Sequence, residues 1–579
     1  MTTLFAYMFF VWVELIGFDN SKADFGVGEY LGRMEVKPQT VSLLLNSDRL
    51  FLSHMKGLPK DFAFLPESCS YRGRPFNVER KRQDWTAFQL KGLVAELQRN
   101  GVQVFVSFFA SEQYPVSQER ATVVADKLAT FLSDYGFDGL HGSDGYAPPR
   151  YLLPECSGKE RVRIARETAK QYAENWRIIV SALKAKNLKC WLNTCWTRDP
   201  YEALYRYGVD YRLLAKTGID GFVVESSAAA QSIEGWNFQK SSPIDRSTAM
   251  LMRLKACVPE TPLVLLHAIN DGTEQWSALR HSPTRTASEI MALGSVFYGE
   301  KRALEGVLAC LADGIAAQEW KSLGKMWKLS FLPARGPVGM RVVWSDRAFD
   351  TEFDDCVVSR DASSNTLLYE LIHHQATLNA MVSVEEAMAD KTMPVVILNP
   401  EFFPEEELTA LRDRLAHVVE LGRGAKRPFA EEYIPVPEGT PPFPGMPNND
   451  TCYWKRPIPE NLPPEIVIKR AAGSIAWRGS LFTPETTDLR VFGFRLANGR
   501  LAVFGRNERD TYLNAAIGFD QMGGRISDVL VHSDFPSLPV TTTLHGRIAP
   551  HDTMFISVKE HEILAPSVPV DESSPVKSF

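Results

Sequence analysis

Acidic side chains follow several apolar runs in the first half of the chain, and these are the residues whose type and spacing could do chemistry. Asp144 follows the run Phe137–Leu140 within the stretch His141-Gly142-Ser143-Asp144-Gly145, and Glu225 directly ends the run Ile219–Val224. Two carboxyl groups that flank a bond can divide the roles of proton donor and nucleophile or base, which is how most glycosidic bonds are cleaved. The pattern therefore predicts a catalytic pair of carboxyl groups.

Each of these carboxyl groups also has a structural interpretation. The glycines around Asp144 would let the backbone approach a ligand closely, but an Asp between glycines is also a common turn residue. Glu225 could sit in a partly desolvated site with a raised pKa, as an acid catalyst needs, or it could pair with a loop Arg or Lys. Asp271 is the third catalytic candidate, and its alternative role is in a type I turn.

Other polar and aromatic residues at or after the ends of the apolar runs are candidates for substrate binding. Aromatic faces stack on the apolar faces of sugar rings, although any single Trp is as readily explained by packing. A lone His after an apolar run is more often a core residue, and Glu14 could equally be buried and paired. The predicted substrate-binding residues are Glu14, Trp12, His141, Asn193, Trp196, His267, Asn270 and Trp276.

Alternating strand and helix patterns predict the scaffold that positions these residues. Eight apolar runs, most of them separated by amphipathic helices, are typical of a (β/α)8 TIM barrel, whose active site lies at the C-terminal ends of its strands. An open doubly wound sheet would carry a glycine-rich phosphate-binding turn after its first strand, and none is convincing. The expected strands are Leu4–Val13, Thr40–Leu45, Val102–Phe109, Phe137–Leu140, Leu188–Leu192, Ile219–Val224, Pro262–Leu266 and Ser295–Tyr298, with helix Leu304–Lys325 closing the ring.

Two of the predicted units enter their strands in the same way. Tyr135-Gly136-Phe137-Asp138-Gly139-Leu140 and Thr217-Gly218-Ile219-Asp220-Gly221-Phe222 both pass from a helix through Gly, an apolar residue and Asp-Gly. The two units could be an internal echo of one another, but the simpler explanation is that the same helix-to-strand turn is used twice.

Changes in composition and in the hydrophobic pattern along the sequence predict four segments. Residues 1–328 form the catalytic barrel, and 329–430 a smaller α/β unit with a strand at Pro394–Leu398. Residues 431–465 are rich in Pro and predict a linker. Residues 466–579 alternate short β-type runs with turns and predict an antiparallel β-sandwich.

Composition limits the classes of partner. The 579 residues carry a net charge of −6, with 45% hydrophobic and 23% charged residues. The chain therefore lacks the excess of Lys and Arg typical of proteins that bind nucleic acid or anionic membranes, and neither is predicted as a partner. The eight Cys are scattered without zinc-type spacing, and no metal or cofactor is predicted. The apolar stretch Leu4–Phe18 lacks a basic flank and a small-residue cleavage site. A cytoplasmic location is the expectation, with periplasmic or secreted locations left open.

The order of barrel, small α/β unit and terminal β-sandwich resembles the glycoside hydrolase family 42 β-galactosidases. The stretches Val342-Val343-Trp344-Ser345, Leu367-Leu368-Tyr369-Glu370-Leu371-Ile372 and Met393-Pro394-Val395-Val396-Ile397-Leu398-Asn399 resemble their glutamine-amidotransferase-like middle domain. That domain serves oligomerisation in the family, often as a trimer, so the resemblance implies a homo-oligomer. No Cys stands in a nucleophile turn, which agrees with the absence of amidotransfer.

The catalytic motif departs from that family. The family carries Asn-Glu at the end of strand four and Glu at strand seven, whereas this chain has Ser143-Asp144 and Asn270-Asp271. An Asp at strand four with a carboxyl at strand six is similar to α-galactosidase-type barrels. That resemblance implies that Asp144 is the nucleophile, Glu225 the acid/base, and Asp271 a hydroxyl-binding or second-choice carboxylate.

The expected function is a glycoside hydrolase acting on oligo- or polysaccharides, and more finely a retaining, exo-acting, galactosidase-like enzyme. A non-catalytic carbohydrate-binding or scaffold protein on a degenerate barrel is the alternative. A lyase or aldolase-type barrel would need a strand-end Lys for a Schiff base or a metal cluster, and neither stands at the predicted strand ends.

Overall fold

The computed structural model describes the greater part of the chain. The described residues are 9–15, 18–45, 61–63, 70–71, 74–75, 84–108, 117–142, 153–154, 156–195, 199–225, 243–268, 289–310, 312, 315–411, 417–424, 430–439, 460–479, 483–484, 488–507, 509, 511–518, 527–531, 543–549 and 553–559. No helix within these ranges is long and apolar enough to cross a bilayer.

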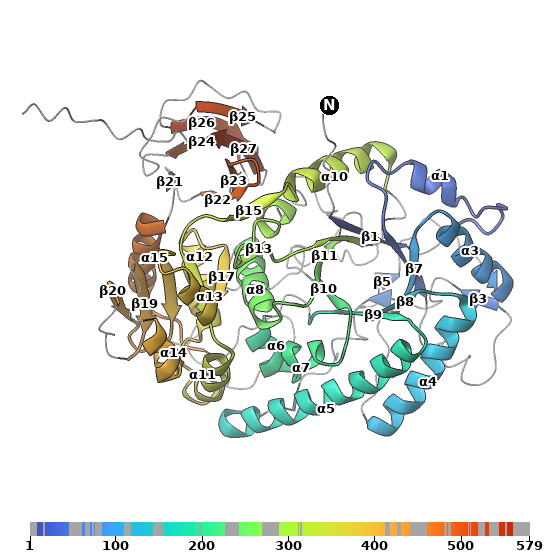
Figure 1. Ribbon diagram of the computed structural model, residues 1–579, viewed down its shortest axis with the longest axis horizontal. Helices are drawn as coiled ribbons and strands as arrows, with labels where there is room; N and C mark the ends of the chain where they lie inside the picture. Colours follow the sequence, from blue (N-terminus) through green and yellow to red (C-terminus); the bar gives the residue numbers. More distant parts are fainter. Residues whose placement is uncertain are drawn as a thin grey trace, which may run out of the picture.

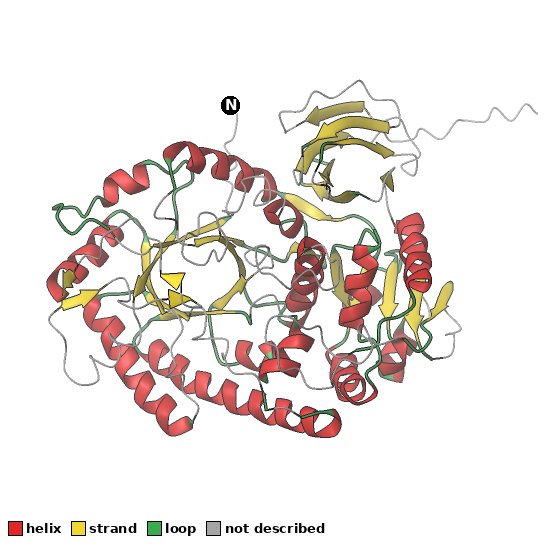
Figure 2. Ribbon diagram, turned by 180° about the vertical axis from the view of Figure 1, so that it is seen from behind, coloured by secondary structure: helices red, strands yellow, loops and turns green. Residues whose placement is uncertain are grey.

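Eight parallel strands close into a barrel, which confirms the predicted fold class. Helices surround the strands on the outside, and the ring is plain in Figure 2. In spatial order the neighbours are β1-β14-β11-β10-β9-β8-β7-β2, so the ring follows the chain and closes between its last and first strands. The strands are β1 (Phe10–Leu15), β2 (Thr40–Leu45), β7 (Gln103–Phe108), β8 (Gly139–Gly142), β9 (Lys189–Asn193), β10 (Gly221–Glu225), β11 (Leu263–Ala268) and β14 (Gly306–Cys310).

Seven of the barrel strands overlap the predicted runs, and the prediction for the eighth was wrong. The eighth strand is β14, which lies inside the segment predicted as the helix Leu304–Lys325. The run Ser295–Tyr298 instead contributes β12 (Phe297–Tyr298) to a second sheet. A short apolar run does not by itself distinguish a buried strand from a buried helix, and this ambiguity caused the error.

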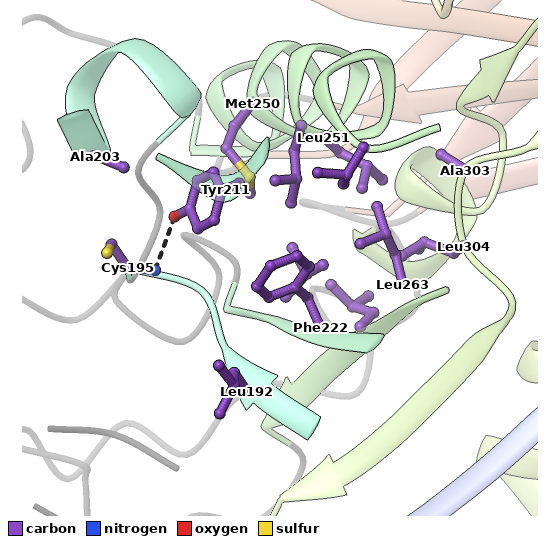
Figure 3. Packing of buried hydrophobic residues seen from close by; sticks show 14 of the residues in the cluster. Leu192, Cys195, Ala203, Tyr211, Phe222, Met250, Leu251, Leu263, Ala303 and Leu304 are labelled. Atoms are coloured by element: carbon purple, nitrogen blue, oxygen red, sulfur yellow. Dashed lines mark hydrogen bonds between the residues drawn. The ribbon is translucent and has the colours of Figure 1, made fainter. Parts of the chain in front are cut away.

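Helices pack their apolar faces against the outside of the barrel. In α4 (Gln118–Tyr135) the buried residues recur every three or four positions, and Gly136 ends the helix with φ 77°, which favours glycine. Figure 3 shows the layer between strands and helices, where Phe222 and Leu263 face Tyr211 and Met250. The other helices around the barrel are α1 (Val27–Gly32), α3 (Ala87–Arg99), α5 (Gly158–Ala185), α6 (Pro200–Tyr207), α7 (Tyr211–Ala215), α8 (Pro243–Cys257) and α10 (Ala317–Ser330).

The repeated Asp-Gly turn has one structural role in both places. Asp138 accepts the backbone N–H of Val104 through Oδ2 (2.7 Å), and Asp220 accepts that of Cys190 through Oδ2 (2.7 Å). Each carboxylate therefore ties the start of one strand to the start of its neighbour. Both units therefore use the same turn to enter their strands.

A second α/β unit packs beside α5 and α8, as Figure 1 shows. Its seven-stranded sheet has the order β13-β12-β17-β16-β18-β19-β20, in which the last six are parallel. The five strands from β17 to β20 follow the doubly wound order 2-1-3-4-5. The strands are β12, β13 (Lys301–Arg302), β16 (Arg341–Trp344), β17 (Ala380–Ser383), β18 (Val395–Leu398), β19 (Val418–Gly422) and β20 (Glu432–Pro435), and the helices are α11 (Asp346–Ser359), α12 (Ser364–His373), α13 (Val384–Ala389), α14 (Glu405–Ala410) and α15 (Glu465–Gly479).

The C-terminal part forms two antiparallel sheets that stand above the second unit in Figure 1. One has the order β15-β22-β23-β27-β25 and the other β21-β24-β26. The outer strand β15 comes from the middle of the chain, directly after the barrel. The strands are β15 (Ala334–Pro337), β21 (Thr483–Pro484), β22 (Leu489–Leu496), β23 (Arg500–Asn507), β24 (Leu513–Gly518), β25 (Ser527–Val531), β26 (Thr543–Ile548) and β27 (Thr553–Lys559).

Candidate active site

The barrel interior is lined by alternate residues of each strand. In β1 the residues Val11, Val13 and Leu15 belong to the core between strands and helices, so Trp12 and Glu14 face inward. The same alternation turns Ser107, His141, Asn193 and Glu225 inward near the C-terminal ends of four further strands. Parallel strands end at one rim of a barrel, and this rim is where such folds carry their chemistry.

Aromatic rings fill the interior below the rim. Phe10 stacks on Trp191 with ring centroids 6.0 Å apart, and Trp12 packs edge-on against Phe105 at 5.2 Å and Trp191 at 5.6 Å. Glycine makes room for them, since a Cβ on Gly221 would lie 2.3 Å from the Trp191 ring. The lower part of the described interior is therefore filled by aromatic rings.

A chain of hydrogen bonds runs across the rim from β1 to β10. The Ser107 hydroxyl contacts the Glu14 carboxylate and lies 3.0 Å from His141 Nδ1. His141 Nε2 lies 2.7 Å from Asn193 Oδ1, and Asn193 Nδ2 donates to Glu225 Oε1 at 3.2 Å. Five strands thus contribute one polar side chain each to a single network.

The hydrogen atoms in this network can be placed by counting donors and acceptors. The Asn193 amide nitrogen donates to Glu225, so its Oδ1 must accept, and His141 Nε2 therefore carries a proton. The Ser107 hydroxyl has one hydrogen for two neighbours. If the hydroxyl donates to Glu14, His141 Nδ1 must also be protonated; if Glu14 is protonated, the hydroxyl donates to a neutral His141.

Both arrangements have the same net charge, because one proton is shared between Glu14 and His141. His141 Nδ1 also lies only 3.3 Å from Glu14 Oε1, and both side chains are buried. In either arrangement Asn193 donates to Glu225, and a hydrogen bond donated to a carboxylate favours its ionised form. The network therefore joins a buried Glu14–Ser107–His141 cluster at one end to the partly exposed, hydrogen-bonded carboxylate of Glu225 at the other.

The structure places four predicted substrate-binding residues inside the barrel. Trp12 is fully buried, donates its Nε1–H to Ser42 Oγ at 2.7 Å, and lies 4.9 Å from the His141 ring, so it supports His141 from below and presents no face for a sugar. His141 and Glu14 are also buried, so they act through their neighbours. Asn193 is 3% exposed and contacts Glu225 directly.

Other predicted residues cannot be placed. His267 lies in β11, where its backbone is described but its side chain is not. Five more predicted site residues lie outside the described residues: Asp144, Asp271, Trp196, Asn270 and Trp276.

Sequence reasoning missed Ser107, which connects Glu14 to His141. A signal for it existed, because Ser107 is a small polar residue on the inward-facing side of an otherwise apolar strand near its C-terminal end. That pattern is weak alone, and Ser107 becomes significant only once β1 and β8 are known to face each other across the barrel.

Comparisons with known proteins give structural neighbours only. No protein-family model matches the chain, and no curated protein matches it in sequence. A β-galactosidase from the psychrophilic Marinomonas ef1 superposes with a TM-score of 0.54 at 10% identity, covering 95% of this chain and 100% of that one. An exo-carrageenase of glycoside hydrolase family 42 from Bacteroides ovatus has a TM-score of 0.45 at 11% identity, covering 81% of this chain and 77% of that one.

A putative α-galactosidase from Bacteroides fragilis NCTC 9343 has a TM-score of 0.40 at 9% identity, covering 96% of this chain and 79% of that one. The solved structures found by the comparison include galactosidases, chitinases and an amylase. The chain shares its fold with the Marinomonas β-galactosidase over nearly the whole of both chains.

Proposed function

We propose that the protein is a glycoside hydrolase whose reaction takes place at the C-terminal rim of the barrel. The observation that carries the proposal is the hydrogen-bond chain that ends on Glu225. Glu225 is partly exposed at a strand end, while the polar groups behind it are buried and hydrogen-bonded. A carboxylate held in this way is preorganised to act on a substrate placed over the rim.

The hydrogen bond from Asn193 supports a specific role for Glu225. A retaining reaction needs one carboxylate as nucleophile and one protonated carboxyl group as acid, about 5 Å apart. Because Asn193 favours the ionised form of Glu225, we assign Glu225 as the nucleophile and Asp144 as the proton donor, with Asp271 as the second choice. This exchanges the roles that the resemblance to α-galactosidase-type barrels implies.

The remaining features of the proposal follow the architecture. We propose exo-acting, galactosidase-like specificity and a retaining outcome on oligo- or polysaccharides. We also propose a homo-oligomer, with a trimer as its expected form, and a cytoplasmic location. The likeness of the fold to a β-galactosidase supports the choice of galactosides as first substrates.

The test is hydrolysis of a panel of 4-nitrophenyl glycosides by the wild type and by Glu225→Gln. We expect turnover to fall by about 10²–10⁴-fold or more, because the substitution removes the charge and keeps the shape. Glu167→Gln is the matched control, since Glu167 is an exposed residue of α5 paired with Arg163. Near-normal turnover in Glu225→Gln would refute the assignment of Glu225.

Azide rescue separates the two roles. Azide added to Glu225→Ala should restore turnover and give a glycosyl azide of inverted configuration if Glu225 is the nucleophile. A product of retained configuration would show that Glu225 is the acid/base. Binding of galactose with no hydrolysis of any substrate would instead favour the non-catalytic carbohydrate-binding or scaffold protein.

A further inference from the structure

The end of strand β9 holds Glu225 at two points. Asn193 Nδ2 donates to the Glu225 carboxylate at 3.2 Å, and the Thr194 hydroxyl accepts the Glu225 backbone N–H at 3.0 Å. The Thr194 backbone N–H in turn donates to the Val223 carbonyl at 2.9 Å. Two consecutive residues therefore fix both the main chain and the carboxylate of Glu225, and the position of that carboxylate depends on theirs.

The Thr194 hydroxyl acts where the regular strand pairing stops. The pairing of β9 with β10 ends at Asn193 and Val223, one residue before Thr194. Beyond this point a side chain, and not a backbone carbonyl, accepts the N–H of Glu225. A side chain is held only as firmly as its own backbone, so the main chain at Thr194 and Cys195 needs support from another element.

Tyr211 supplies this support. It is the first residue of α7 and is buried, and its hydroxyl accepts the Cys195 backbone N–H at 2.9 Å, as Figure 3 shows. Its ring packs edge-on against Phe222 of β10, with ring centroids 5.5 Å apart. Tyr211 therefore contacts β10 through its ring and the end of β9 through its hydroxyl, and these two strands carry Glu225 and its hydrogen-bond partners.

Helix α7 is anchored to the second α/β unit. A helix of five residues is too short to be stable by itself. Asp210 caps it by accepting the Arg212 backbone N–H at 2.9 Å and pairs with the Arg212 guanidinium at 2.8 Å. The guanidinium also pairs with Asp350 of α11 at 2.7 Å and lies over the Phe349 ring at 4.7 Å. The residues on both sides of Tyr211 are thus fixed, and tertiary packing sets the position of its hydroxyl.

We propose that Tyr211 is a positioning residue for the reaction at Glu225, which it aligns through the backbone of Cys195 and the hydroxyl of Thr194. The inference rests on the proposed function, because it takes Glu225 as the nucleophile. Burial raises the pKa of Tyr211 well above its usual value, so its hydroxyl stays neutral over the pH range in which carboxyl groups titrate. The contribution of Tyr211 is therefore geometric, and a misplacement of about 1 Å can cost roughly 10²-fold in rate.

Amide hydrogen exchange tests the structural link without any substrate. Tyr211→Phe removes only the hydroxyl, so exchange of the Cys195 and Glu225 amides should accelerate by about tenfold, the effect of losing one hydrogen bond. Tyr433→Phe is the matched control and should leave both rates unchanged, because the Tyr433 hydroxyl donates to the Gly422 carbonyl at 2.7 Å in the second unit. An unchanged exchange rate at Glu225 in Tyr211→Phe would overturn the proposal.

Kinetics test the consequence for the reaction. Tyr211→Phe should lower kcat on a 4-nitrophenyl glycoside about tenfold, with KM changed by no more than about twofold. The acidic limb of the kcat/KM profile should move up by about 0.5–1 pH unit, because a displaced Glu225 loses the hydrogen bond from Asn193 that favours its ionised form. His141 and Glu14 keep their own contacts in this variant, and a smaller folded fraction alone would lower the rate without moving the limb.

Thr194 gives an independent second variant. Thr194→Val is similar in shape but cannot accept the Glu225 N–H, so it should reproduce the fall in kcat and the shift of the limb, whereas Thr194→Ser keeps the hydroxyl and should recover most of the loss. A normal kcat and an unmoved limb in Tyr211→Phe and Thr194→Val, with Glu225→Gln inactive, would refute the positioning role alone. Near-normal turnover in Glu225→Gln would instead remove the proposed function on which the role depends.

Discussion

The network at the barrel rim predicts that Ser107 and Asn193 are energetically coupled although no hydrogen bond joins them. Both contact His141, Ser107 at Nδ1 (3.0 Å) and Asn193 at Nε2 (2.7 Å). Ser107→Ala leaves Nδ1 and the Glu14 carboxylate without the hydroxyl between them, and Asn193→Ala leaves Nε2 without its acceptor. Each substitution should lower the free energy of unfolding by roughly 1–3 kcal/mol, the cost of leaving a buried polar group unsatisfied.

The double variant should lose less than the sum of the single losses. Asn193 fixes the proton on Nε2 of His141, and once Asn193 is removed the imidazole can rearrange its protons to suit Ser107 or its absence. We expect a coupling free energy of about 0.5–3 kcal/mol, as residues within one hydrogen-bond network show. Urea-induced unfolding of the wild type, both single variants and the double variant measures it.

A distant buried Asn provides the control for this cycle. Asn379 donates to the carbonyls of Ser295 and Gly493, away from the barrel rim, so Ser107→Ala and Asn379→Ala should be additive within about 0.5 kcal/mol. If Ser107→Ala and Asn193→Ala are additive to the same degree, His141 does not transmit the effect of one partner to the other. The counting of protons across the rim would then be wrong.

Two further predictions concern stability. Burial raises the pKa of Glu460 to about 7, so the folded state holds a proton that the unfolded state releases near its usual pKa of 4.5. The free energy of unfolding should therefore fall as pH rises from about 4.5 to 7, by at most roughly 3 kcal/mol. Above pH 7 it should level off, because Glu460 is then ionised in both states. Glu460→Gln should remove this slope in unfolding measured at a series of pH values, and an unchanged slope would contradict the origin of the effect. Gly221→Ala should destabilise by roughly 1–3 kcal/mol, because its Cβ would meet the packed Trp191 ring. Gly473→Ala, a helical position with open space around its Cβ, should not destabilise, and equal melting temperatures for the two variants would argue against a tightly filled barrel interior.

Local sequence determined much of the barrel. Apolar runs separated by amphipathic helices specify parallel strands, and seven of the eight strands could be predicted because a strand buried on both faces needs little more than such a run. Gly136 and the Asp138 turn are also local, since one requires a left-handed backbone and the other a short acceptor next to a strand. The position of Glu225 at the rim follows as well, because all parallel strands of a barrel end on the same side.

The eighth strand could not be decided locally. Gly306–Cys310 is as apolar as a helix segment, and it becomes a strand because closing the barrel requires a partner for both β1 and β11. Gly306 permits this pairing, since a Cβ there would lie 1.8 Å from the Phe10 carbonyl oxygen. Its conformation therefore depends on residues almost 300 positions earlier in the chain.

What the sequence by itself determined is therefore the set of strands and the rim at which their polar ends gather. Only the tertiary structure decided which polar side chains meet. Glu14, Ser107 and His141 lie 93 and 34 positions apart in successive steps, and they form one network because the closed ring turns β1 toward the neighbouring strands β7 and β8. The same holds for Arg253 of α8, whose guanidinium lies over the ring of Trp344 in the second unit at 5.2 Å. Hydrogen bonds depend on distances of a few tenths of an ångström, and such distances are fixed by packing, on which spacing along a sequence carries no information.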